Sequence, residues 1–298
     1  YFPSISAGWR VLEEDFMSGV DAFSELKLRG SYGITGNQEI GNFSYLGLYT
    51  GANYLDRPGI AQTQIPNPDL KWEETNQFNI GADLGFFSGR VNLALDYYIK
   101  TTDNLLFSRP VPTQSGFGSY QSNIGATENK GFEIALNTVN FDGGSDGFNW
   151  SSDFNISFNR NEVTELYQGQ DIFYGFGGNS LVLREGEPIG TFYGFIADGV
   201  FPTTDAVPAS RAVDRNGDGI IDTQAGDVNF RDLNGDGIIT DDDLTIIGDA
   251  QPDFVGGFTN TLRYKGFDMS VFMQFSYGNE IAAPSHQYQK HLGNDFLD

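Results

Sequence analysis

The most regular alternation of apolar and polar residues along the chain lies between residues 76 and 100. From Asn76 to Phe86 every second residue is apolar, and after a Ser88-Gly89 turn the alternation resumes from Val91 to Lys100. A period of two puts all the apolar side chains on one face of a β-strand. A tight turn containing glycine joins antiparallel strands. The pattern therefore predicts a long β-hairpin with one apolar face, made by Phe78, Ile80, Ala82, Leu84, Phe86, Val91, Leu93, Leu95, Tyr97 and Ile99.

Two more hairpins follow from the same pattern. One joins alternating runs around residues 132–136 and 148–158 across the turn Asp142–Gly147, and the other joins 254–264 to 269–277 through Lys265-Gly266. On the second strand of the first of these, the face opposite the apolar one is entirely polar. It consists of Asn149, Ser151, Asp153, Asn155, Ser157 and Asn159.

The remaining segments divide into short strands and long loops. Ser4–Val11 and Leu26–Ile34 alternate over fewer residues, and Ile189–Phe201 is predicted to form a strand. Residues 35–74 and 105–123 lose the alternation and are rich in Gly, Asn, Pro or Ser, so we expect long loops there.

Strand length and loop parity favour a transmembrane β-barrel. Strands of soluble proteins usually have about 5–6 residues, whereas these alternate over about 11, which is the length that crosses the apolar band of a bilayer when tilted. Tight turns also alternate with long loops, as the periplasmic turns and extracellular loops of outer-membrane barrels do. The fold class expected is all-β, an antiparallel transmembrane barrel.

A soluble β-sandwich remains the alternative, because its sheets also have one apolar and one wet face. The two folds differ in where the apolar side chains point. A barrel requires Phe78, Leu93, Phe154 and Met273 on one outer face of a single sheet. A sandwich requires two sheets that pack these residues against each other.

The composition of the chain excludes several classes of function. The chain has 298 residues, with 40 acidic and 17 basic ones and a net charge of −23, so it has no basic surface for nucleic acid. Cysteine is absent, which excludes disulfides, zinc–thiolate sites and cysteine nucleophiles. No run of about 18 apolar residues predicts a membrane helix. Because the chain starts at Tyr1 without a signal peptide, we expect it to be a piece of something larger.

Catalysis has little support in the sequence. The only histidines, His286 and His291, stand in a polar tail, and neither a Gly-x-Ser-x-Gly nor a His-Glu-x-x-His motif is present. Pairs of carboxylates are expected by chance in so acidic a chain. We therefore expect the protein not to be an enzyme.

The segment 232–243 has the ligand spacing of a calcium loop. Oxygen donors at positions 1, 3 and 5 are followed by Gly237, which allows the sharp turn at position 6, and the loop closes with a carboxylate at position 12. Position 12 is Asp rather than the Glu of an EF-hand, so we expect a weaker, structural calcium site. The candidate ligands are Asp232, Asn234, Asp236, Ile238, Thr240 and Asp243. The alternative is a pair of Asn-Gly and Asp-Gly turns with solvated acids.

A second, weaker candidate occupies 214–225. Its spacing repeats that of the first loop, but position 12 is Ala225, so the closing carboxylate must come from elsewhere. Its candidate ligands are Asp214, Asn216, Asp218, Ile220 and Asp222. Both loops fall in a segment, about 164–252, that the hairpin parity predicts to be a long extracellular insertion.

Several stretches together resemble the SusC/RagA-type TonB-dependent outer-membrane transporters of Bacteroidota. They are spread in order over nearly the whole chain, which makes the match more specific than any single motif. The stretches are FPSISAGWRV (2–11), LKLRGSYGITGNQEIG (26–41), 67–106, NIGATENKGFEIAL (123–136), REGEPIGTFYGF (184–195), 232–243 and 247–281.

The resemblance implies a 22-stranded barrel closed by an N-terminal plug, of which residues 1–298 would be part of the barrel without the plug. Such transporters import glycan oligosaccharides or peptides, together with a SusD-like surface lipoprotein, and TonB acts on the plug. The resemblance therefore implies an outer-membrane protein in contact with lipid, with its calcium-like loops outside the cell. The alternative function is that of a secreted, calcium-stabilised β-sandwich that binds carbohydrate.

Overall fold

The structure is a computed structural model that describes residues 1–39, 41–54, 57–145, 147–175, 180–203, 206–208 and 223–282. Its chain forms two compact units. Unit 1 contains residues 1–172, 184–188 and 251–279, and unit 2 contains 173–183, 189–250 and 280–298. Each unit is described by itself.

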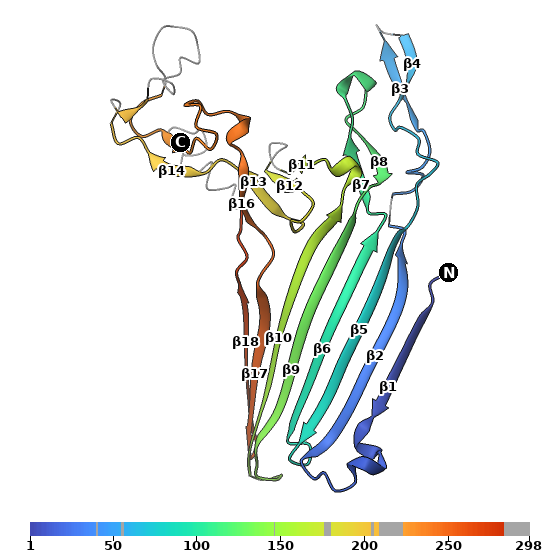
Figure 1. The fold of residues 1–298 in the computed structure, drawn as a ribbon, viewed down its shortest axis with the longest axis vertical. Coiled ribbons are helices and arrows are strands. Elements are labelled where there is room, and N and C mark those ends of the chain that lie inside the picture. Colours follow the sequence, from blue (N-terminus) through green and yellow to red (C-terminus); the bar gives the residue numbers. More distant parts are fainter. Residues whose placement is uncertain are drawn as a thin grey trace. The chain divides into compact units, whose positions relative to one another are not determined.

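Unit 1 is built on one antiparallel sheet of eight strands in the order β1-β2-β5-β6-β9-β10-β17-β18 (Figure 1). Apart from β1, each strand has 11 or more residues, as a bilayer-crossing strand requires. The strands are β1 (Ser4–Arg10), β2 (Phe23–Asn37), β5 (Glu73–Phe86), β6 (Val91–Asp103), β9 (Ala126–Asp142), β10 (Phe148–Glu165), β17 (Phe254–Tyr264) and β18 (Phe267–Tyr277).

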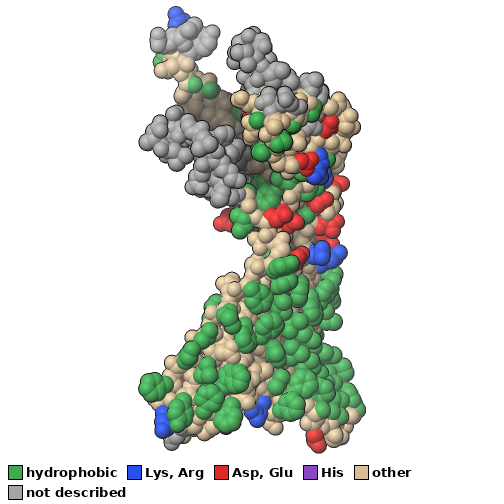
Figure 2. Space-filling view, turned by 90° about the vertical axis from the view of Figure 1, so that its left-hand side faces the viewer, with side chains coloured by type: hydrophobic (Ala, Val, Ile, Leu, Met, Phe, Trp, Pro, Cys, Tyr) green, Lys and Arg blue, Asp and Glu red, His purple; other side chains and the backbone are tan. Residues whose placement is uncertain are grey.

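The register puts the alternating apolar residues of all these strands on one face, here called the apolar face. Phe78 lies opposite Tyr32 and Ile99, and Phe154 lies opposite Leu136 and Phe258. Directly opposite residues of an antiparallel pair point to the same side of the sheet. The face is continuous across the strands (Figure 2).

No second sheet covers the apolar face in the described residues. The side chains of Phe78, Ile80 and Met273 are 45%, 52% and 51% exposed. Phe78, Leu93, Phe154 and Met273 therefore share one face of one sheet, as the barrel interpretation requires, and they do not pack between two sheets. The sandwich alternative is wrong.

The connections alternate as expected from β5 onward, with tight turns at one end of the sheet and long excursions at the other (Figure 1). The β1–β2 connection, residues 11–22, lies at the turn end but is longer and contains two short 3-10 helices. At the β5–β6 turn, Phe87, Ser88 and Gly89 take φ angles of 53°, 55° and 82°, and Lys265 takes 51° in the β17–β18 turn. Left-handed backbone of this kind matches the twist of the flanking strands.

Two of the long connections were expected to be irregular, and that expectation was wrong in part. Each contains its own hairpin, β3 (Tyr49–Tyr54) with β4 (Arg57–Gln62) and β7 (Leu106–Pro110) with β8 (Ser119–Asn123). Gly, Pro and Asn interrupt the alternation in these short strands, so their pattern was hidden. The hairpins are tied to the main sheet's connections by Asn67, whose side-chain amide donates to the carbonyl of Gln121 at 2.8 Å.

Unit 2 contains short strands only. Four form one sheet, in the order β11-β12-β13-β16, and two form another, β14-β15. The strands are β11 (Ile172–Tyr174), β12 (Leu181–Leu183), β13 (Thr191–Gly194), β14 (Ala197–Val200), β15 (Val228–Phe230) and β16 (Thr245–Asp249). The prediction of one strand over Ile189–Phe201 was wrong, because β13 and β14 pair in different sheets. Among the described residues, no helix has the length and apolar character needed to cross a bilayer.

We expect an arginine on the apolar face of β10 to be much more costly than one on its other face. In full-length protein assembled in lipid vesicles, Ile156→Arg should lower the free energy of unfolding by about 2–4 kcal/mol, since the guanidinium would meet hydrocarbon. Its neighbour Ser157 points the other way and lies beside Glu133, so Ser157→Arg is the matched control. Guanidinium titrations measure both, and equal losses would contradict the two-faced assignment.

Candidate functional site

The face opposite the apolar one, here called the polar face, is hollowed by a groove of about 680 Å³ across β2, β5, β6, β9 and β10. An adjoining cavity of about 330 Å³ extends it to β1. Side chains of alternate residues reach the groove because each strand contributes its polar set to this side. They include Arg29, Ser31, Gln77, Asn79, Asp96, Tyr98, Asn129 and Asn159.

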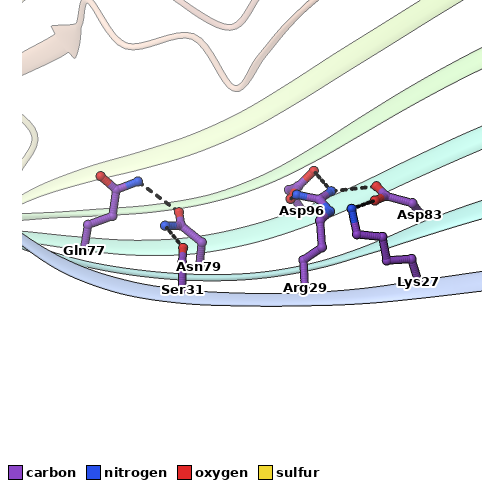
Figure 3. Close-up of polar contacts among 7 residues, drawn as sticks. All are labelled: Lys27, Arg29, Ser31, Gln77, Asn79, Asp83 and Asp96. Carbon is purple, nitrogen blue, oxygen red and sulfur yellow. Dashed lines mark hydrogen bonds and ion pairs between the residues drawn. The ribbon is translucent and has the colours of Figure 1, made fainter. Parts of the chain in front are cut away.

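An ionic cluster lies at one end of the groove, where β2, β5 and β6 run side by side. The guanidinium of Arg29 contacts Asp83 at 2.9 Å and Asp96 at 3.0 Å, and the Lys27 ammonium lies 3.8 Å from Asp83. Figure 3 shows that these four side chains rise from the same side of the sheet. Their side chains are 26–36% exposed, so solvent screens the attraction between them and the cluster contributes more to position than to stability.

One N–H group of the Arg29 guanidinium has no acceptor in the described part of the chain. Its Nε is buried and has no hydrogen-bond partner within the described residues. A buried N–H without an acceptor costs about 1–3 kcal/mol relative to a paired one. The ionic cluster thus contains a buried, unmet donor beside two carboxylates.

Gly81 makes the cluster possible. It lies opposite Arg29 on β2 and Asp96 on β6. A Cβ built there would come within 3.0 Å of the Arg29 guanidinium and would overlap the Asp96 carboxylate. Only glycine lets the ion pairs lie flat across this strand.

Neutral hydrogen-bonding groups line the rest of the groove. Gln77 donates to Asn79 at 2.9 Å and Asn79 to Ser31 at 3.0 Å, as Figure 3 shows. The Tyr98 hydroxyl donates to Asn159 at 2.9 Å. Amides, hydroxyls and an aromatic ring can bind a polar solute by hydrogen bonds and stacking, without forming a covalent bond to it.

Tyr98 is held in place by the strand beside it. It lies directly opposite Gly131 of β9, and a Cβ at Gly131 would come within 2.2 Å of the Tyr98 ring. The ring therefore covers the glycine, an arrangement that pins the register of two strands.

The calcium-like loop 232–243 is described and closes on itself by hydrogen bonds. Asp232 accepts from the backbone N–H of Gly235 at 2.6 Å and of Gly237 at 2.7 Å. Asp243 is fully buried and accepts from the N–H of Leu233 and of Thr240, at 2.7 and 2.9 Å. Asp243 thereby joins the start of the loop to its end.

Asn234 and Asp236 complete the loop. Asn234 Oδ1 accepts from the Asp236 N–H at 2.9 Å, and the Asn234 amide donates to Asp236 at 3.0 Å. Asp236 also accepts from the N–H of Ile238 at 2.9 Å. The short helical turn Asp241–Asp243 follows, capped by Thr240.

The donor set is all oxygen, as calcium requires, and each carboxylate oxygen that accepts one N–H keeps a lone pair. Within the described part of the chain, however, no three carboxylate or imidazole side chains converge closely enough to hold a metal ion. Calcium binding by the six residues therefore stays a prediction.

The second calcium-like candidate, with Asp214, Asn216, Asp218, Ile220 and Asp222, lies outside the described residues, as do His286 and His291. Sequence reasoning singled out the polar faces of the strands but missed the Arg29 cluster. The sequence does contain the residues of this cluster, with Lys27 and Arg29 on one strand and Asp83 and Asp96 on the next two. Only the pairing register shows that they lie side by side.

Comparison with known proteins supports the fold and the family. Residues 1–192 match the family model described as TonB dependent receptor-like, beta-barrel. The chain is 38% identical to TonB-dependent receptor P39 of Formosa agariphila, over 94% of the chain and 29% of that protein. It is 33% identical to TonB-dependent receptor SusC of Bacteroides thetaiotaomicron, over 94% of the chain and 28% of SusC.

A solved structure titled "Structure of the RagAB peptide transporter" superposes with a TM-score of 0.76 at 28% identity, covering 93% of this chain and 29% of that one. The chain therefore spans less than a third of the length of each of these three proteins.

We expect Gly81→Ala to lower stability by about 1–3 kcal/mol, because the added methyl group displaces the Arg29–Asp96 ion pair. Gly30 provides the control. It lies on the apolar face next to Arg29, and a Cβ there meets nothing closer than 4.0 Å, so Gly30→Ala should change stability by less than about 1 kcal/mol. Denaturant titration of the full-length protein compares them. Equal effects would show that the close approach at Gly81 is unimportant.

Proposed function

Because the chain belongs to the β-barrel family of TonB-dependent receptors, we propose that the full-length protein imports a solute across the outer membrane. The observation that supports this most is a sheet with two opposite faces. One face is apolar and exposed across all eight strands, as contact with lipid requires, and the other carries a polar groove, as a lumen requires. Membership of this family also favours a transporter over an enzyme.

For the solute we propose glycan oligosaccharides or peptides, captured with a SusD-like surface lipoprotein. A similar protein bears the name SusC and a similar structure is titled as a peptide transporter. The groove supports either class, because both present many hydroxyl or amide groups to side chains such as Gln77, Asn79 and Tyr98. Energy would come from TonB, acting on a part of the protein outside residues 1–298.

We also propose that the ends of the strands bearing the long connections face the outside of the cell. The tight turns at the opposite end match the short periplasmic turns of such barrels. In this orientation the long insertion and its calcium-like loops are extracellular. A calcium ion in 232–243 would neutralise crowded carboxylates and order the loop, so its role is structural.

Import has a direct test in cells. Deleting the gene for the full-length protein should abolish uptake of labelled oligosaccharides or labelled peptides, and reintroducing the gene should restore uptake unless a protonophore collapses the proton gradient. The protein should fractionate with the outer membrane. Uptake unchanged by the deletion, or a protein found in the culture medium, would overturn the proposal.

Calcium binding has its own test. Equilibrium dialysis of the full-length protein with calcium should show one fewer bound ion for Asp236→Ala, because a ligand is lost at position 5. Asp242 is exposed and stands in the same loop at a position that supplies no ligand, so Asp242→Ala should keep the full number of ions. The calcium assignment fails if Asp236→Ala binds as many ions as the parent protein.

A further inference from the structure

Two positive charges lie directly opposite each other on the apolar face. Arg160 of β10 pairs with Lys130 of β9 in the ladder, so both side chains leave the sheet on the side of Phe132 and Phe158. Like charges opposite each other in a sheet repel. Such a pair is favourable where an anion lies between the two side chains.

The next residue pair on the apolar face is negatively charged. Glu128 lies opposite Glu162, and the ammonium of Lys130 contacts the Glu128 carboxylate at 2.5 Å. Arg160 is exposed, and its side chain makes no hydrogen bond or ion pair within the described residues. One of the two cations is thus held in place by a carboxylate and the other is open to a ligand.

Their height on the sheet places the pair at the border of the apolar band. Trp150 and Arg160 are ten residues apart on β10, which is about 33 Å along the strand. At a tilt of about 40° this separates them by about 25 Å across the bilayer, the height of the apolar band of a membrane barrel. Trp150 thus falls in the aromatic girdle at the turn end, and Arg160 falls at the level of the headgroups at the other end.

Figure 2 shows apolar side chains over the lower part of the strands, and Lys or Arg side chains both above them and at the lower edge. A basic rung between hydrocarbon and an acidic rung is complementary to a lipid, whose anionic phosphate lies directly outside its acyl chains.

We propose that Lys130 and Arg160 form a binding site for the phosphate group of an anionic membrane lipid whose acyl chains lie along Phe132 and Phe158. The guanidinium of Arg160 donates to the phosphate oxygens, and Lys130 donates from the facing strand. Glu128 weakens the site by holding Lys130. The site requires only that the apolar face contacts lipid, so failure of import or of its substrate assignment would leave it standing.

Native mass spectrometry of the detergent-solubilised full-length protein tests the proposal. Titration with a phosphorylated lipid A should show a bound lipid. Arg160→Gln should weaken its binding about fivefold, since each basic residue near a lipid surface contributes about one kcal/mol. The double variant Arg160→Gln/Lys130→Gln should bind the lipid more weakly still. The matched control is Lys100→Gln, because Lys100 lies beside this rung on β6 but points to the polar face, and it should bind lipid as the parent does.

Glu128→Gln is the most discriminating variant, because it should tighten lipid binding by releasing Lys130, a gain that misfolding cannot produce. Phosphatidylcholine and free glycerol phosphate should bind no more tightly to the parent protein than to the double variant. Equal lipid affinity in the parent and Arg160→Gln proteins would overturn the proposal. So would glycerol phosphate binding as tightly as the lipid.

Discussion

A β-strand has only two faces, and in this sheet each face must suit a different solvent. Every backbone N–H and C=O of a strand in hydrocarbon has to pair with a neighbouring strand, since lipid offers no alternative partner. The ladder from β1 to β18 meets that requirement across its interior strands. With the backbone satisfied, the period of two decides which side chains meet lipid and which meet water.

The same register also decides where charge can gather. Lys27, Arg29, Asp83 and Asp96 come from three strands and meet on the polar face only because Arg29 pairs with Gly81 and Gly81 with Asp96. On the apolar face, charge is confined to the ends of the strands, where Lys130 and Arg160 share a rung. A register slip of one residue would turn the side chains of both charged groups to the opposite face, and so to the wrong solvent. The function therefore depends on the register as much as the fold does.

Much of this arrangement could be predicted from the sequence, because alternation is local. Residues 76–100 predict their own hairpin and faces, and the tight turns predict the parity of the connections. The hairpins β3–β4 and β7–β8 were missed because glycine, proline and asparagine blur the alternation in strands of five or six residues. The segment Ile189–Phe201 was predicted as one strand, yet β13 and β14 pair with different strands far along the chain, which local pattern does not encode.

In the groove, too, local features could be predicted from the sequence and long-range pairing could not. Its polarity follows from single strands, but the Arg29 cluster depends on pairing between residues 67 positions apart. The calcium-like loop is the opposite case. Its residues from Asp232 to Asp243 are close in sequence, so spacing alone singles out the segment, although the prediction was of calcium ligands and not of the hydrogen bonds that close the loop.

The central claim is that the apolar face meets lipid while the polar face meets water. Nitroxide labels placed singly at residues 154 to 159 of the full-length protein in lipid bilayers test it most directly, by their collision rates with oxygen and with a water-soluble nickel complex. The account predicts that oxygen access is high at Phe154, Ile156 and Phe158, and that nickel access is high at Asn155, Ser157 and Asn159. Equal access to the nickel complex at all six positions would contradict it.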